Sequence, residues 1–251
     1  MLLLEAGCAV VRPPSLPPPP AEKPQPTPLE LHGLLIERDV ALRSFQGQGR
    51  LEYDGPDGKL RSANMVVVKA PDKVRIDFRS PFSLTYTVVS DGTELLAYDR
   101  GEKVLYRGRP SPQNFGRYTR VPVDLSMLVS LVRGLPPMPG GRGAGRVLPV
   151  EQGWLWEASL ETGGRLGIVF DRQAWLPRLA RLEGSGRDFV AYFEEYDEVS
   201  GMPTAHRIRA ELPSGGVVKL EYGTIWRDRT HGDNAFHIEA PTGVRVVNMD
   251  G

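Results

Sequence analysis

The sequence predicts a mainly β protein. We expect a single curved antiparallel sheet of about eleven strands, an unclosed half-barrel, with an N-terminal helix and one inserted helix. Apolar and charged residues alternate strictly in several short segments, as they do in strands with one buried face. Turn-forming pairs such as Asp91-Gly92 and Arg100-Gly101 separate these segments, and no strand–helix–strand rhythm is visible. Short connections of this kind favour an antiparallel meander over a parallel sheet.

The first predicted element is an amphipathic helix over residues 29–44. Leu31, Leu34 and Leu35 fall on one side of it, and charged residues such as Glu37 fall on the other. An apolar stripe of this width needs a partner surface. We therefore expect the helix to cover an apolar face of the sheet.

A second helix is predicted in the middle of the chain, over residues 122–134. Asp124 is placed to cap its N-terminus, and Gly134 is placed to end it. The segment is apolar almost all round, so it is buried in the fold or lies in the mouth of a cavity. The Gly- and Pro-rich stretch 135–145 behind it predicts a mobile loop.

Strands account for most of the remaining chain. Strict alternation marks residues 73–79, 206–212 and 218–222, the last with a continuation to Trp226. Less regular strand candidates cover residues 49–53, 60–69, 84–90, 94–99, 103–107, 154–160, 165–170, 179–183 and 189–196. One face of the resulting sheet is apolar along nearly its whole length, and the opposite face is charged. A sheet of this size curls, so its apolar face must be filled by side chains, helices or a ligand.

Composition narrows the function classes. The 251 residues carry 31 Lys and Arg against 31 Asp and Glu, so the electrostatic footprint of a nucleic-acid binder is missing. A single Cys excludes an intramolecular disulfide and a Cys-rich zinc site. No apolar stretch reaches the roughly 18 residues that a membrane-spanning helix requires.

Residues 1–28 predict a tether rather than folded structure. Nine prolines lie between Pro13 and Pro28, which favours an extended, semi-rigid spacer. Ahead of the spacer, Cys8 follows a leucine run and the small residues Ala6 and Gly7, and this resembles the lipobox of a bacterial lipoprotein signal. The resemblance implies that Cys8 is a lipid anchor. The alternative is an unmodified Cys in a disordered tail.

Residues 29–249 resemble the LolA/LolB carrier superfamily and its LolB-like bacterial lipoproteins. Four segments carry the resemblance: a first strand entered from the helix, a short loop with an apolar tip, a lid segment from Val-Pro-Val to Gly-Leu-Pro, and a closing apolar strand that leads into Pro-x-Gly-Val. They correspond to residues 45–51, 80–84, 121–136 and 236–244.

The resemblance implies an unclosed barrel with a helical lid that binds acyl chains of lipoproteins or other lipids. It also implies a site on the outer membrane facing the periplasm, with the anchor at Cys8, and a periplasmic carrier protein as a further partner. The physics is compatible, because each buried methylene contributes about 0.8 kcal/mol, and a sixteen-carbon chain about 12 kcal/mol gross.

Fourteen apolar and aromatic residues are predicted to line the cavity: Val74, Ile76, Phe78, Tyr86, Val88, Trp154, Trp156, Ile168, Phe170, Phe189, Phe193, Ile208, Leu220 and Tyr222. The lid candidates are Leu128, Leu131 and Val132. Phe82 and Leu84 are the candidates for a loop that contacts the membrane. Ordinary core packing is the alternative for each residue, although two helices are few to fill so large an apolar face.

Catalysis and metal binding find little support in the sequence. His231 and His237 lie beside Asp233, but their spacing fits no standard metal site. We expect no metal site, no cofactor and no enzymatic activity, because no nucleophile stands with a partner base. The alternative to a lipid carrier is a structural or adaptor lipoprotein, whose barrel is filled by its own side chains and whose loops dock a protein partner in the envelope.

Overall fold

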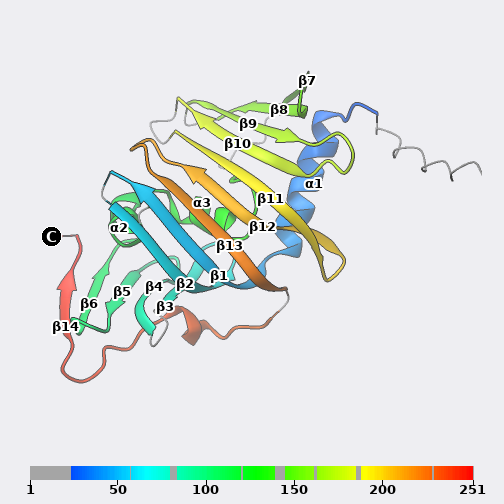
Figure 1. The fold of residues 1–251 in the computed structure, drawn as a ribbon. Coiled ribbons are helices and arrows are strands. Elements are labelled where there is room, and N and C mark those ends of the chain that lie inside the picture. Colours follow the sequence, from blue (N-terminus) through cyan, green and yellow to red (C-terminus); the bar gives the residue numbers. More distant parts are fainter. Residues whose placement is uncertain are drawn as a thin grey trace, which may run out of the picture.

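The fold is one large sheet that carries its α-helices on one face (Figure 1). We analysed a computed structural model, which describes residues 24–56, 58–79, 84–119, 121–138, 145–160, 163–184, 188–227 and 229–250. Within these residues the helices are α1 (Pro28–Ala41), α2 (Pro112–Thr119), α3 (Leu125–Val132) and the short 3-10 helix η1 (Asp233–Phe236). The predicted mainly-β fold with an unclosed sheet is confirmed.

The described part of the chain forms 14 strands, more than the eleven expected. In chain order they are β1 (Ser44–Gly55), β2 (Gly58–Lys69), β3 (Lys73–Arg79), β4 (Leu84–Ser90), β5 (Leu95–Asp99), β6 (Val104–Gly108), β7 (Arg146–Val150), β8 (Gly153–Ser159), β9 (Arg165–Phe170), β10 (Pro177–Glu183), β11 (Phe189–Val199), β12 (Met202–Glu211), β13 (Val217–Arg227) and β14 (Arg245–Asn248). Their order across the sheet is β14-β6-β5-β4-β3-β2-β1-β13-β12-β11-β10-β9-β8-β7.

This strand order explains where the helices lie. The chain meanders from β1 outward to β6, resumes with β7 at the opposite edge, and returns to pair β13 with β1. The connection from β6 to β7 must therefore cross the width of the sheet, and it carries α2 and α3. Buried residues of all three α-helices share one apolar core with the strands. We call the face that packs against these helices the inner face.

Helix α1 matches the first predicted helix closely, although it ends at Ala41. Its start is fixed by a capping box, in which the Thr27 side chain accepts a hydrogen bond from the Glu30 backbone and Glu30 bonds back to the Thr27 backbone. Leu31 and Leu35 are buried in the core, as the apolar stripe predicts.

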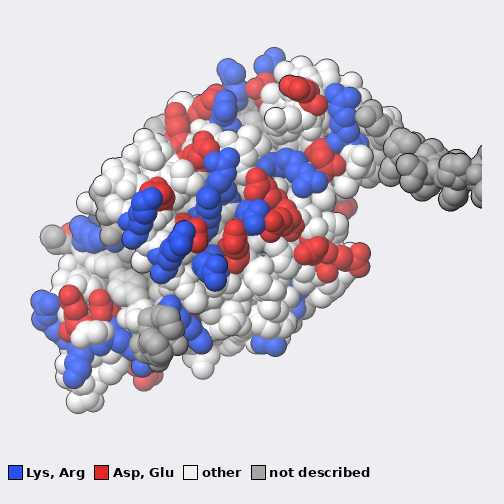
Figure 2. Space-filling view, in the orientation of Figure 1, with Lys and Arg blue, Asp and Glu red and all other residues white. Residues whose placement is uncertain are grey.

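The outer face is only partly as predicted. Figure 2 views this face, where Lys and Arg alternate with Asp and Glu over the central strands. Ion pairs of Arg207 with Glu195 and with Glu221 belong to this charged surface. Over β2 to β4, however, Val67 and Val89 are buried beneath Phe236 of η1 in a second apolar cluster. The uniformly charged outer face was therefore a wrong prediction, because the alternation of β2 and β4 also places valines there.

Three further elements differ from the sequence-based prediction. Helix α2 was not expected, and neither were β7 and β14. β14 pairs in parallel with β6, against the expected antiparallel pattern, because the chain returns across the outer face through η1 before it reaches that edge. The expected closing strand from Phe236 onward is instead the end of η1 followed by non-strand backbone.

Candidate functional site

An apolar cavity of about 50 Å³ lies between the inner face and α3. The sheet contributes its floor from β1, β3, β12 and β13, and α3 with the segment before it contributes the roof. The lining residues are Leu51, Ile76, Phe78, Thr119, Val121, Leu128, Leu131, Val132, Ile208, Ala210, Val218 and Leu220. The only polar side chain among them, Thr119, bonds its hydroxyl to the backbone oxygen of Phe115 at 2.8 Å. The walls are thus suited to hydrocarbon.

The predicted lid residues occupy the roof. Leu128, Leu131 and Val132 all line the cavity from α3. Asp124 occupies the expected N-cap position, but its side chain makes no capping hydrogen bond, and Gly134 follows the end of the helix as expected. Gly134 has a φ of +71°, the left-handed conformation that a helix-ending glycine adopts easily. The short, apolar helix is therefore held above the sheet between two well-defined ends.

The predicted cavity residues fall into two groups. Ile76, Phe78, Ile208 and Leu220 line the cavity. The others belong to the surrounding core or pack against it, which is the alternative that the sequence left open: Val74, Tyr86, Val88, Trp154, Trp156, Ile168, Phe170, Phe189, Phe193 and Tyr222. Cys8 and Phe82 lie outside the described residues, and Leu84 begins β4.

Arg133 fastens the end of α3 to α1, and sequence analysis missed it. Its side chain is 2% exposed and donates to Asp39 Oδ1 at 2.8 Å and to the backbone oxygens of Val129 and Leu42. Burial lowers the pKa of the guanidinium, and the Asp39 carboxylate counteracts this. A lone Arg directly after an apolar helix is the signal that could have revealed this contact.

Tyr222 provides a second attachment from the sheet. Its hydroxyl donates to the backbone oxygen of Val132 at 2.6 Å. Burial raises the pKa of this hydroxyl, so it stays protonated and remains a hydrogen-bond donor. Arg133 and Tyr222 together form what we call the latch, a small set of polar contacts that keeps an otherwise apolar helix in place.

A cleft of about 220 Å³ lies on the other side of α3. It is lined by Leu35 and Asp39 of α1, by Met127 and Ser130 of α3, and by residues 135–138. The latch residue Arg133 also borders it. Space is therefore present on the side of α3 that faces away from the apolar cavity.

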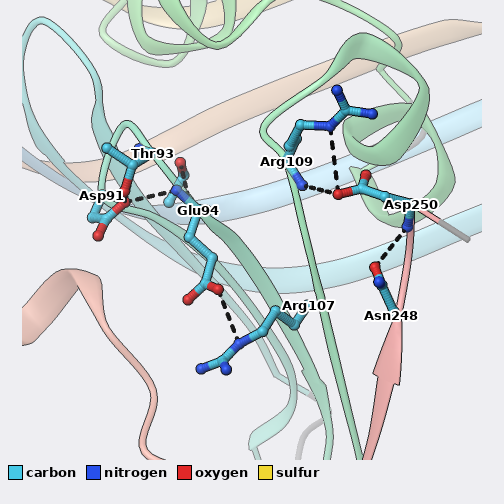
Figure 3. Close-up of polar contacts among 8 residues, drawn as sticks. Asp91, Thr93, Glu94, Arg107, Arg109, Asn248 and Asp250 are labelled. Atoms are coloured by element: carbon cyan, nitrogen blue, oxygen red, sulfur yellow. Dashed lines mark hydrogen bonds and ion pairs between the residues drawn. The ribbon is translucent and has the colours of Figure 1, made fainter.

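A polar groove lies at the sheet edge where β14 joins β6 (Figure 3). Its charges are paired with one another: Arg107 contacts Glu94 at 2.9 Å, and Asp250 accepts from the Arg109 backbone and from Asn114, each at 2.9 Å. The Asn114 hydrogen bond is the main cause that lowers the pKa of Asp250. These contacts fasten the C-terminal strand to the end of β6 and to α2.

Neither a metal cluster nor a membrane-spanning helix emerges from the described residues. No group of three or more His, Cys, Asp or Glu side chains among them is arranged to hold a metal ion. None of the described helices is long and apolar enough to cross a membrane.

Comparison with known proteins places the fold. No protein-family model and no curated protein sequence matches the chain. Among solved structures, a LolA superfamily protein from Nitrosomonas europaea superposes with a TM-score of 0.57 at 16% identity, covering 82% of this chain and 97% of its own. A DUF1329 family protein from Desulfovibrio piger gives 0.60 at 15% identity, with 83% and 96% covered.

A domain from Vibrio parahaemolyticus that is named for outer membrane lipoprotein sorting gives a TM-score of 0.59 at 15% identity. It covers 83% of this chain and 95% of that domain. Each of the three matches covers more than four fifths of this chain and at least 95% of its own. The chain therefore has a LolA-like fold, as its sequence resemblance implied.

Proposed function

We propose that the protein binds acyl chains of lipoproteins or other lipids in the cavity beneath α3 and aids their localisation to the outer membrane. The observation that carries the proposal is a cavity walled by apolar side chains and roofed by a short apolar helix. A protein named for lipoprotein sorting and a LolA superfamily protein share the fold. An acyl chain that water cannot dissolve needs such an apolar container for transfer.

Binding requires α3 to move. The cavity of about 50 Å³ is well below the roughly 300–1,000 Å³ of ligand pockets, so the carrier function requires this structure to be a closed state. The cleft beside Met127 and Ser130 gives the helix room to shift, and the latch residues Arg133 and Tyr222 are what it must release. Burial of a sixteen-carbon chain, at about 12 kcal/mol gross, can offset these few contacts.

Anchoring completes the proposed role. Cys8 carries the lipid anchor, and the Pro-rich tether holds the domain at the outer membrane on its periplasmic side. A periplasmic carrier protein delivers the ligand. Phe82, together with Leu84 at the start of β4, contacts the membrane during release. A Phe82→Glu variant that still transferred its ligand to vesicles would remove the loop from this account.

One observation favours the alternative function. The inner face is already largely filled by α1, α2 and α3, as a structural or adaptor lipoprotein with a self-filled barrel would require. In that case the loops dock a protein partner and α3 never leaves the sheet. The two functions differ in a single measurable property, the uptake of an acyl chain.

Filling the cavity tests the proposal. Ala210 lines the cavity from β12, and Ala210→Leu places additional carbon atoms inside it. The carrier function predicts that the wild-type protein takes up a fluorescent acyl probe and that Ala210→Leu weakens this binding about tenfold, or about 1.4 kcal/mol. Ala63→Leu on the exposed side of β2 is the matched control. A folded wild-type protein that takes up no probe would establish the self-filled barrel.

A further inference from the structure

A buried amide lies in the inner face without a hydrogen-bond partner. Asn64 of β2 is 2% exposed, and neither its Oδ1 nor its Nδ2 has a partner within the described part of the chain. Leaving a buried polar group unpaired costs about 1–3 kcal/mol. An apolar residue at this position would avoid that cost, so the amide calls for an explanation other than packing.

The sheet register places Asn64 beside the apolar cavity. Side chains alternate along a strand, so Asn64 shares the inner face with Val66 and Val68, which belong to the core. Its cross-strand neighbours are Gly49 on β1 and Phe78 on β3, neither of which has a side chain that can pair with an amide. Phe78 itself lines the cavity. The unpaired amide is thus one strand away from a cavity wall.

A second unpaired polar group lies on the other side of Phe78. Tyr86 of β4 is the cross-strand partner of Phe78, and its buried hydroxyl has no partner among the described residues. Its ring contacts Phe78 and stacks on Tyr118 of α2, at centroid distances of 6.1 and 6.0 Å. Burial raises the pKa of this hydroxyl, so it remains a neutral donor. Asn64 and Tyr86 therefore flank Phe78 on strands about 10 Å apart.

We propose that Asn64 and Tyr86 form a polar subsite on the two sides of Phe78, beside the apolar cavity, in which either group donates a hydrogen bond to an ester or amide carbonyl of an acyl ligand. This inference rests on the proposed function, which it deepens by naming the ligand class. The Asn64 amide and the Tyr86 hydroxyl offer donors to carbonyl oxygens. Because none of the described residues that line the cavity is charged, a carboxylate or phosphate would be buried there without a counter-charge from them, and a neutral head group is favoured.

A pair of probes that differ by one ester group tests the subsite. Methyl decanoate and undecane have the same number of carbon atoms, and their affinities for the full chain are measured by displacement of a fluorescent acyl probe. For each protein we take the ratio of its affinity for methyl decanoate to its affinity for undecane. We expect this ratio to be about tenfold higher for the wild-type protein than for Asn64→Leu. Gln46→Leu is the matched control, because Gln46 is a buried amide of β1 that points to the outer face.

A second measurement keeps the test independent of the folding of the variant. In wild-type protein labelled with ¹⁵N, the side-chain NH₂ signals of Asn64 should shift on addition of methyl decanoate but not of undecane. A ratio of the two affinities that Asn64→Leu leaves unchanged would overturn the subsite and assign to Asn64 no more than an internal water. Displacement by neither probe would instead refute the carrier function itself.

Discussion

On the two faces of the sheet, two equally buried polar residues differ in their hydrogen-bond partners. Asp77 of β3 faces outward and Asn64 of β2 faces inward, and both are 2% exposed. Asp77 accepts a bifurcated hydrogen bond from Arg75 Nε, at 3.1 Å to Oδ1 and 2.9 Å to Oδ2, and a further one from Thr87 at 2.8 Å. Asn64 has no partner within the described residues.

The difference distinguishes polar side chains that serve the fold from polar side chains that are available to a ligand. Beneath η1 the polar groups are paired: Arg75 also donates to the backbone oxygen of Ala235, and Lys69 and Lys73 both contact Asp233. These groups are satisfied by one another. On the inner face, the unpaired amide and hydroxyl lie on the two sides of Phe78, which lines the apolar cavity, and our proposal is that a ligand pairs with them.

The outer-face network should give the largest effect on stability. Asp77→Ala leaves Arg75 and the buried Thr87 hydroxyl without their acceptor, and we expect the free energy of unfolding to fall by about 2 kcal/mol. Urea denaturation measures this loss. Asp54→Ala removes the exposed pair with Lys59 and serves as control, with an expected change below about 0.5 kcal/mol. Equal effects of the two variants would contradict the contrast between paired and exposed charges.

The inner face should respond with the opposite sign. Asn64→Leu removes a buried polar group that has no partner to lose, so we expect the free energy of unfolding to rise by about 1 kcal/mol in the ligand-free protein. The same denaturation measurement applies. A loss of stability as large as that of Asp77→Ala would mean that Asn64 has a partner inside the protein, which would contradict the contrast between the two faces.

Loss of the contact between Arg133 of the latch and Asp39 should affect the rate of ligand uptake more than the stability of the fold. Asp39→Ala removes the carboxylate that Arg133 contacts, while the backbone acceptors of Arg133 remain. Because Asp39 is half exposed, we expect a loss below about 1 kcal/mol. Stopped-flow uptake of an acyl probe should become severalfold faster. Unchanged uptake would show that the release of this contact does not limit opening of α3.

The smallest effect concerns the pH dependence of the outer face. Hydrogen bonds from Lys69 and Lys73 lower the pKa of Asp233 from its usual 3.8 to about 2. A lowered folded-state pKa contributes stability that is present above pH 4 and is lost as the pH falls through about 2. The stability advantage of the wild-type protein over Asp233→Asn should therefore disappear between pH 4 and 2. A constant difference across this range would contradict the ion pairs.

Sequence analysis recovered the elements whose patterns are local. The amphipathic α1, the strictly alternating β3, β12 and β13, and the apolar α3 were all expected, since their periodicity defines them. The capping box of α1 was not, because Thr27 and Pro28 had been assigned to the tether. Helix α2 was missed because its segment, Pro112–Thr119, is mostly polar and contains Gly116. β14 was missed because its partner β6 lies far away in the sequence and pairs with it in parallel.

Sequence analysis predicted part of the apolar lining of the candidate site, but not its polar groups. The three predicted lid residues and four of the predicted cavity residues line the cavity, because apolar periodicity already indicates which side chains face inward. Asn64 could not be found in this way, since the segment Ser62-Ala63-Asn64 gives no sign of its strand neighbours. Only the register, which sets Gly49 and Phe78 beside it, shows that its amide is unpaired.

The central claim, that the inner face holds acyl chains, is tested most directly by mass spectrometry of lipid extracted from the purified domain. Removal of residues 1–23 eliminates any lipid attached at Cys8 and retains Thr27, which caps α1. Our account predicts an acyl ester or amide in stoichiometric amount. A folded, lipid-free domain that also takes up no fluorescent acyl probe would contradict it.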